Sequence, residues 1–184
     1  MAADLDKIKE TKRKSVQSVI QKLIDNNIDF CIIGGYCRYL CNMEPDYKDV
    51  DIVTNTDINL RELFPEADTN PYNGLELPFC DVWDIKNNII PSKSFEELYD
   101  NYFISYDAIM YHPYTNTWYT KNFSYEADIN EKVEDRQKHD LCVEKLIRLE
   151  ERGIKLTQKA KDYINKHSIG SSNIDQEKLW MYNY

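Results

Sequence analysis

The segment CIIGGYCRYLCNMEPDYKDVDIVTN, residues 31–55, gathers residue types that bind phosphate groups and divalent metal ions. Asp49 and Asp51 lie in a stretch that alternates polar and apolar residues, so in a strand both carboxylates point to the same face. Two carboxylates side by side repel each other unless a cation lies between them, and Mg²⁺ or Mn²⁺, which prefer oxygen ligands, are the natural partners. The pair therefore predicts a metal site.

Two glycines and an arginine precede this pair. Gly34 and Gly35 follow the apolar run at residues 28–33 and begin a predicted helix. Without a Cβ, their backbone lets an anion approach the amide groups closely. Arg38, one turn into that helix, is placed to bind the same anion through two hydrogen bonds. A phosphate site beside a carboxylate metal site is what metal-assisted phosphoryl transfer requires.

The elements that must position these residues follow from hydrophobic periodicity and from the Gly, Pro and Asn positions. Strands dominate the middle of the chain, helices flank it, and the C-terminal part is helical, which predicts a mixed α/β arrangement. The predicted elements are a helix at 4–26, a strand at 28–33, a helix at 36–42, a strand at 49–54, a helix at 59–64, a polar loop at 68–74, a strand at 76–85, a helix at 95–99, a hairpin from 105–111 and 118–121, and helices from about residue 129, at 133–152 and 157–167.

The two motifs together resemble a known family. IIGGYCRYL followed by KDVDIVTN resembles the head domain of class II tRNA nucleotidyltransferases and bacterial poly(A) polymerases, within the DNA polymerase β superfamily. The similarity covers roughly residues 28–165, through DIVTNTDINLRELFPEAD, FCDVWDIK, YDAIMYHPYTNTWY and VEKLIRLEERGIKLTQKAKDYI. It implies an α/β (α+β) polymerase β-like palm, a mixed central sheet flanked by helices. We expect residues 1–128 to form this head with its N-terminal helix, and residues 129–184 a helical neck-like extension and tail.

The resemblance also implies roles for individual residues. Asp49 and Asp51 would bind two Mg²⁺ (or Mn²⁺) ions, and Asp81 would be a third carboxylate, either a metal ligand or a base. Asp84, on the other face of the same predicted strand, stays an alternative to Asp81. The expected contacts to the phosphates of an NTP are Gly34, Gly35 and Arg38. Further basic positions that match the family, and that we expect to contact the phosphates of the nucleotide, are Lys86, Lys145 and Arg148.

Some positions depart from the family pattern. Tyr39 stands where an acidic residue follows the arginine, and Asp107 replaces the usual asparagine. The arginine pair expected before the hairpin is absent at residues 101–103. The segments that hold a tRNA in the family have no counterpart here, so CCA addition is not inferred.

Three functions remain open. The resemblance implies a metal-dependent enzyme that transfers NMP from an NTP to a hydroxyl group of an RNA or tRNA 3′ end, a small molecule or a protein, releasing pyrophosphate. The departures favour an alternative, a weak or inactive domain that binds nucleotide or a partner. A third reading is a structural α/β protein whose motifs are coincidental. Retention of both Asp49 and Asp51 favours the enzyme, since an inactive copy has no chemical reason to keep a repulsive pair.

Composition limits the partners and the compartment. A formal net charge of −9 and a pI near 4.9 disfavour a broad basic surface that wraps nucleic acid. No apolar run approaches the roughly 20 residues that span a bilayer, so we expect no membrane partner. The charged N-terminus lacks a secretory signal, and the 5 cysteines are an odd number. Both observations predict reduced thiols and a cytoplasmic location.

Two cysteine arrangements offer competing chemistry. Cys31, Cys37 and Cys41 could contribute to a zinc site, but the sequence has no C-x-x-C pair and these positions belong to an apolar face, which favours buried thiols. His139 and Cys142 are spaced as neighbours on a helix, which would suit a thiol nucleophile only if the imidazole were held at hydrogen-bond distance from the sulfur.

Overall fold

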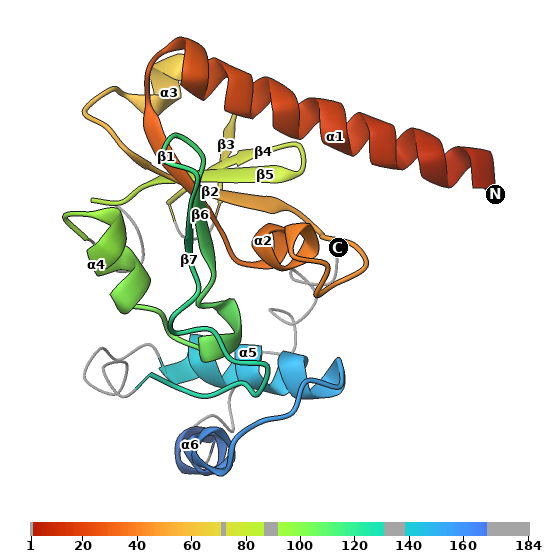
Figure 1. Ribbon diagram of the computed structural model, residues 1–184, viewed down its shortest axis with the longest axis vertical. Coiled ribbons are helices and arrows are strands. Elements are labelled where there is room, and N and C mark those ends of the chain that lie inside the picture. The colour runs from red at the N-terminus through yellow and green to blue at the C-terminus, as the bar shows by residue number, and fades with distance from the viewer. Residues whose placement is uncertain (1, 71–72, 87–91, 131–138, 169–184) are drawn as a thin grey trace. The chain divides into compact units, whose positions relative to one another are not determined.

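The structure is a computed structural model that describes residues 2–70, 73–86, 92–130 and 139–168 (Figure 1). The chain divides into two compact units. The first comprises residues 1–102 and 107–123, and the second residues 103–106 and 124–184. We keep the predicted head (1–128) and extension (129–184) as a proposal.

The first unit is built on a seven-stranded mixed sheet in the order β3-β4-β5-β2-β1-β6-β7. The β2 and β5 strands are parallel, and every other neighbouring pair is antiparallel. The mixed α/β class predicted from the sequence is confirmed. The strands are β1 (Asp29–Ile33), β2 (Val50–Asn55), β3 (Asp68–Thr69), β4 (Leu75–Leu77), β5 (Cys80–Asp84), β6 (Met110–His112) and β7 (Thr117–Tyr119).

Alternation along the central strands gives the sheet two buried faces. Ile52 belongs to a core with Val16 and Leu23 of α1 (Ala2–Asp25). The next residue, Val53, lies in a second core with residues of α4 (Phe95–Asp100). Because successive residues of a strand point to opposite faces, helices are needed on both sides. The remaining helices among the described residues of this unit are α2 (Gly35–Leu40) and α3 (Leu60–Leu63), and the 3₁₀ turn at Ser105–Asp107 contributes Asp107 to it.

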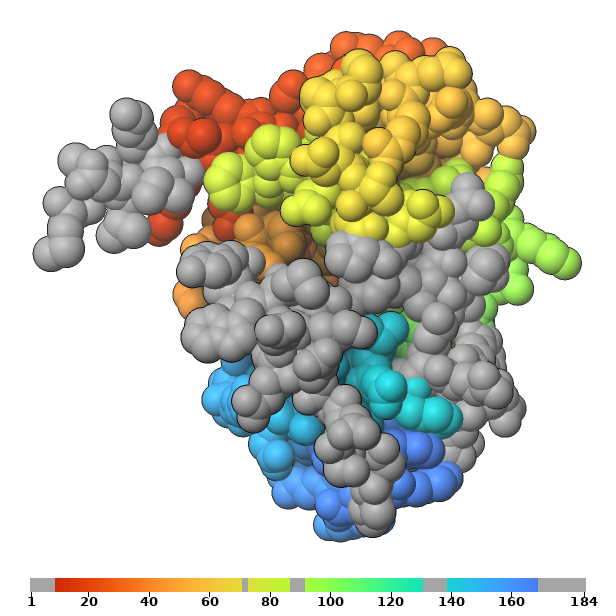
Figure 2. Space-filling view, turned by 180° about the vertical axis from the view of Figure 1, so that it is seen from behind, coloured from red at the N-terminus to blue at the C-terminus, as the bar shows by residue number. Residues whose placement is uncertain are grey.

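The end of α1 is fixed against the segment that follows α3. Lys22 lies 4.9 Å from the ring centroid of Phe64 and 3.6 Å from the Glu66 carboxylate. Seen from behind, the yellow surface of the α3 and β3 region lies against the red and orange surface of the N-terminal segment (Figure 2). The predicted helix at 4–26 is therefore confirmed, with bounds that differ by one or two residues.

Three predicted elements are wrong in detail. The single strand at 76–85 is a hairpin, β4 and β5, that turns at Pro78 and Phe79, where Phe79 has a φ of 62°. The predicted polar loop at 68–74 contributes β3, which pairs with β4. Residues 105–107 form a 3₁₀ turn, and the strands of the predicted hairpin are β6 and β7. Short strands carry too few residues for periodicity to detect them.

The described residues of the second unit form the helices α5 (His139–Glu151) and α6 (Gln158–Ser168), which bury residues such as Leu146 and Tyr163. Ile104 forms an isolated bridge with Ile129, where a helix was predicted to begin. The predicted helical residues 131–138 and the tail from 169 lie outside the described residues. Within the described ranges, the helices are too short or too polar to cross a membrane.

Candidate active site

Four carboxylates, three of them on adjacent strands, gather on one face of the sheet. The parallel register of β2 and β5 sets Asp51 opposite Asp81, and the antiparallel register of β4 and β5 sets Glu76 opposite Asp81. Residues paired in this way share a face of the sheet, and Asp49 lies two residues before Asp51. The sheet thus brings together the three aspartates that the sequence predicts for the site, with one glutamate that it does not predict.

These carboxylates influence one another electrostatically. Burial and, less strongly, the negative charges of Asp49 and Glu76 together raise the pKa of Asp81 to about 6, against the opposing effect of a hydrogen bond from Asn70. The pKa of the neighbouring Cys80 thiol is raised by burial and by the charges of Asp51, Asp81 and Asp49. Ionising the whole group is therefore costly unless a cation compensates the charge.

The residues present fit a divalent cation in donor chemistry. Carboxylate oxygens are the ligands that Mg²⁺ and Mn²⁺ prefer, and the charges of Asp49 and Glu76 add to burial in raising the pKa of Asp81. Within the part of the chain that the structure describes, no three His, Cys, Asp or Glu side chains are already arranged to hold a metal ion. The donor set is present, and enclosing an ion requires the carboxylates to turn toward it.

Gly34 brings the glycine motif into contact with this acidic group. Its φ of 70° and ψ of −132° belong to a conformation that L side chains rarely adopt, and its N–H donates to the Ile109 carbonyl at 3.1 Å. A Cβ at Gly34 would lie 3.4 Å from Oδ2 of Asp51. The backbone of the turn between β1 and α2 therefore passes directly beside the carboxylate.

Arg38 has different partners from those that the sequence predicts. Its side chain is only 5% exposed, Nε donates to Glu44 at 2.8 Å, and Nη1 donates to Asp107 at 2.8 Å. Burial alone would lower the pKa of the guanidinium, but the charges of Asp107 and Glu44 hold that pKa above its usual value. In this structure Arg38 ties α2 to the residues before β6, so binding a phosphate would require it to leave two partly buried carboxylates. The unusual Asp107 is its ion-pair partner.

Lys86 and Asp84 lie away from the acidic group. Asp84 is about 10 Å along β5 from Asp81, at a strand rise of about 3.3 Å per residue, and it faces the opposite side. Its Oδ2 accepts from the Thr56 N–H at 3.1 Å and its Oδ1 from the Lys86 N–H at 2.9 Å. The Lys86 ammonium pairs with Asp57. This geometry gives Asp84 a role in ending the strand and favours Asp81 as the third carboxylate.

The other predicted residues lie in the second unit or in the core. Lys145 and Arg148 lie on α5 of the second unit, and their role stays a prediction. Cys31 and Cys37 are fully buried free thiols, and burial raises the pKa of both. The zinc alternative therefore has no support among the described side chains.

The alternative of a thiol nucleophile at Cys142 is not supported either. Burial raises the pKa of Cys142 to about 11, which keeps the thiol protonated. Nδ1 of His139 lies 2.7 Å from the hydroxyl of Tyr163, and the His139 ring stacks on His167 with centroids 3.9 Å apart.

The sequence misses Glu76 and Asn70 for a physical reason. In one continuous strand, residues 76 and 81 would point to opposite faces because they are separated by an odd number of positions. The turn at Pro78 and Phe79 folds them into cross-strand neighbours instead. A proline within the predicted strand was the available signal.

Comparisons with known proteins support the fold. No protein-family model matches the chain, and no curated protein matches its sequence. Among solved structures, a tRNA nucleotidyltransferase complexed with a primer tRNA and an incoming ATP analog has a TM-score of 0.55 and 14% identity, over 79% of this chain and 48% of that one. The apo form I of a tRNA-processing enzyme has a TM-score of 0.56 and 14% identity, over 87% and 46%.

A tRNA-processing enzyme with CTP has a TM-score of 0.53 and 14% identity, over 79% of this chain and 44% of that one. The chain spans less than half the length of these proteins. At this level of identity the likeness establishes the fold, which is nucleotidyltransferase-like. The structural resemblance to tRNA nucleotidyltransferase predicted from GGYCR and DVD is confirmed at that level.

Proposed function

We propose that this protein is a metal-dependent nucleotidyltransferase that moves NMP from an NTP to a hydroxyl acceptor and releases pyrophosphate. One observation carries the proposal. Asp51 and Asp81 pair in register on parallel strands, with Asp49 two residues away and the Gly34 backbone beside the Asp51 carboxylate. The nucleotidyltransferase-like fold supports the same reaction class.

In the proposed reaction, the acceptor hydroxyl oxygen attacks the α-phosphorus of the NTP. The bond to the bridging α–β oxygen breaks, and pyrophosphate leaves with the electron pair. Asp49, Asp51 and Asp81 would hold Mg²⁺ or Mn²⁺, which when bound lowers the pKa of the hydroxyl and neutralises phosphate charge. Asp81 is partly buried, and we assign it either as a ligand or as the acceptor of the hydroxyl proton.

At Gly34 a Cβ would already touch Oδ2 of Asp51, and the positive φ of 70° disfavours any side chain, so the backbone stays open to a ligand beside the carboxylate. We keep Gly34 and Gly35 as proposed phosphate contacts. The structures with a similar fold include one with a primer tRNA and an ATP analog and one with CTP, which supports an NTP donor and an RNA acceptor. We also place the protein in the cytoplasm, where its 5 free cysteines would stay reduced.

The test uses each α-labelled NTP with Mg²⁺ or Mn²⁺ and bulk cellular RNA. We expect labelled RNA and released pyrophosphate from the native protein, and a loss of about a thousandfold or more in the Asp49→Asn/Asp51→Asn variant, since charge stabilisation of the transition state is removed. Asp57→Asn is the matched control because that carboxylate is 97% exposed and pairs only on the surface. Equal rates in the native protein and the double variant would refute the proposal.

A nucleotide-binding module without catalysis is a second candidate. It is favoured by the ion pairs that already occupy Arg38. This candidate predicts a rise in melting temperature with NTP and metal, abolished in the double variant, and no pyrophosphate release with any NTP.

A further inference from the structure

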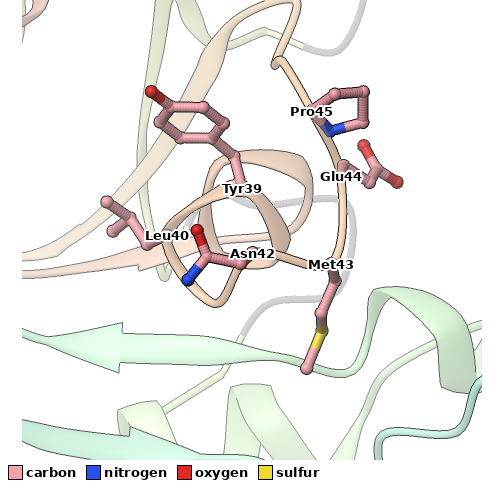
Figure 3. A pocket seen from close by; sticks show the side chains of 6 residues that line it. All are labelled: Tyr39, Leu40, Asn42, Met43, Glu44 and Pro45. Atoms are coloured by element: carbon pink, nitrogen blue, oxygen red, sulfur yellow. The ribbon is translucent and has the colours of Figure 1, made fainter.

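A surface pocket of about 500 Å³ lies at the C-terminal end of α2. Six residues line this α2 pocket: Tyr39, Leu40, Asn42, Met43, Glu44 and Pro45 (Figure 3). Its size falls in the range of small-molecule sites. It combines an aromatic ring, apolar side chains and an amide, which are the groups that hold a flat heterocycle with polar edges.

The ring of Tyr39 is held in a fixed orientation. It stacks on Tyr36 with centroids 5.9 Å apart and an interplanar angle of 22°, and it contacts Tyr47 at 4.9 Å. Tyr36 and Tyr47 are partly buried against the core, whereas Tyr39 is 36% exposed. If the three rings served only to pack α2 on the sheet, burying Tyr39 would have been favourable. A rigid ring with open surface is suited to stack on a nucleobase.

Asn42 supplies a polar group at the same pocket. Its φ is 56°, its N–H donates to the Tyr39 carbonyl at 3.0 Å, and it is exposed. Among the described residues its side-chain amide has no hydrogen-bond partner. An amide offers both a donor and an acceptor, the pair that can recognise the edge of a base.

The residues that line this pocket are joined in sequence to the acidic group on both sides, before residue 39 and after residue 45. The α2 helix begins at Gly35, next to the residue that lies beside Asp51, and Tyr39 is about 6 Å further along the helix axis at about 1.5 Å per residue. After the pocket residues, Lys48 immediately precedes Asp49 in the sequence. Its ammonium is 66% exposed and 3.9 Å from the Asp49 carboxylate. It offers a cation for a phosphate between the two sites.

We propose that the α2 pocket binds a nucleobase of a single-stranded RNA acceptor, with Tyr39 stacking on the base and Asn42 contacting its edge. This inference rests on the proposed function, because it names the acceptor class of the same active site. A net charge of −9 leaves little capacity to neutralise many phosphates. Recognition of a short single strand by stacking fits this surface better than docking of a duplex.

The test measures the Kd of a short fluorescent oligoribonucleotide by anisotropy, without NTP. We expect Tyr39→Ala and Tyr39→Leu to weaken binding about tenfold, the size of one lost base stack, and Tyr39→Phe to bind as the native protein does. Asn42→Ala should change the preference among oligo(A), oligo(C) and oligo(U). Tyr125→Ala is the control, an exposed tyrosine elsewhere in the chain.

Tyr39→Leu keeps a large apolar side chain but removes the aromatic ring. If Tyr39→Ala and Tyr39→Leu both weaken binding while their melting curves match that of the native protein, the loss is due to base stacking. Unchanged Kd in both variants would overturn the inference, as would a duplex that binds as tightly as the single strand. A result in the α-labelled NTP assay in which the label is transferred only to protein would also overturn it. The failure of the proposed function looks different, because the native protein would then release no pyrophosphate whatever the effect of Tyr39.

Discussion

The first unit contains two groups of charged residues that differ in one respect. Around Arg38, opposite charges meet: the guanidinium lies 2.8 Å from Glu44 and 2.8 Å from Asp107, almost excluded from solvent. Around Asp51 and Asp81, like charges meet on adjacent strands. The first group is complete within the chain and serves the structure. The second carries an excess of negative charge that a bound cation would compensate, and for that reason we propose it as the site of chemistry.

The largest effect on stability should come from breaking the complete group. Arg38→Met leaves two partly buried carboxylates, 12% and 19% exposed, without their cation, and we expect a loss of about 3 kcal/mol in the free energy of unfolding. Urea titration measures this loss. Arg38→Lys keeps the charge but not the two-pronged geometry, so it should lose less. If Arg38→Met unfolds like the native protein yet cannot bind NTP, Arg38 is a phosphate ligand after all.

The contact between the two motifs gives the next prediction. Gly34→Ala places a side chain in a conformation reserved for glycine, 3.4 Å from Oδ2 of Asp51. We expect a loss of about 2 kcal/mol in the free energy of unfolding. Gly153 is a matched control, because it also has a positive φ of 84° but open space around it. A Gly153→Ala variant carries backbone strain alone, so a metal-binding defect confined to Gly34→Ala would separate contact from strain.

Removing a charge from the acidic group should stabilise the native state, whereas removing the charge of Arg38 should destabilise it. The raised folded pKa of Asp81, about 6, means that its ionised form destabilises the native state above that pH. As the pH falls from about 6 toward the ordinary carboxyl pKa of 3.8, the native state takes up a proton that the unfolded chain does not, and this cost shrinks progressively. Asp81→Asn should therefore raise the free energy of unfolding by about 1 kcal/mol at pH 8, by roughly half as much at pH 5, and by almost nothing below pH 4.

Thermal melts of Asp81→Asn and the native protein across this pH range, without metal, measure that difference. With Mg²⁺ the order should reverse, because only the native protein keeps the full donor set. A variant that is less stable than the native protein at pH 8 without metal would show that Asp81 is a structural residue, and the contrast with Arg38 would fail.

Sequence patterns predicted the acidic group well and the complete group poorly. Asp49 and Asp51 could be placed on one face because the period of a strand is local information. The partners of Arg38 could not, since Asp107 is 69 positions away and reaches Arg38 only through pairing of β1 with β6. The same limit hid Glu76, whose place beside Asp81 depends on a turn that reverses the chain. Long buried elements are predictable from periodicity, whereas contacts across the sheet depend on register.

Replacing Lys86 should have the smallest effect, and it tests whether a cation at the far end of β5 is close enough to act on the nucleotide. It was predicted as a phosphate partner, yet it follows the far end of β5 and pairs with Asp57, whose side chain is 97% exposed. Exposed ion pairs contribute little to stability because water and salt screen them, so Lys86→Ala should leave the free energy of unfolding nearly unchanged. It should also leave the KM for NTP within about twofold, since the removed charge is largely screened at that distance.

Steady-state pyrophosphate release by Lys86→Ala, beside Lys48→Ala, measures this difference. Lys48 adjoins Asp49 and should raise the KM for the acceptor when removed. A tenfold rise in the KM for NTP in Lys86→Ala would show that the far end of β5 reaches the nucleotide. The site would then extend beyond the three aspartates, because a cation acts on a phosphate strongly only at short range.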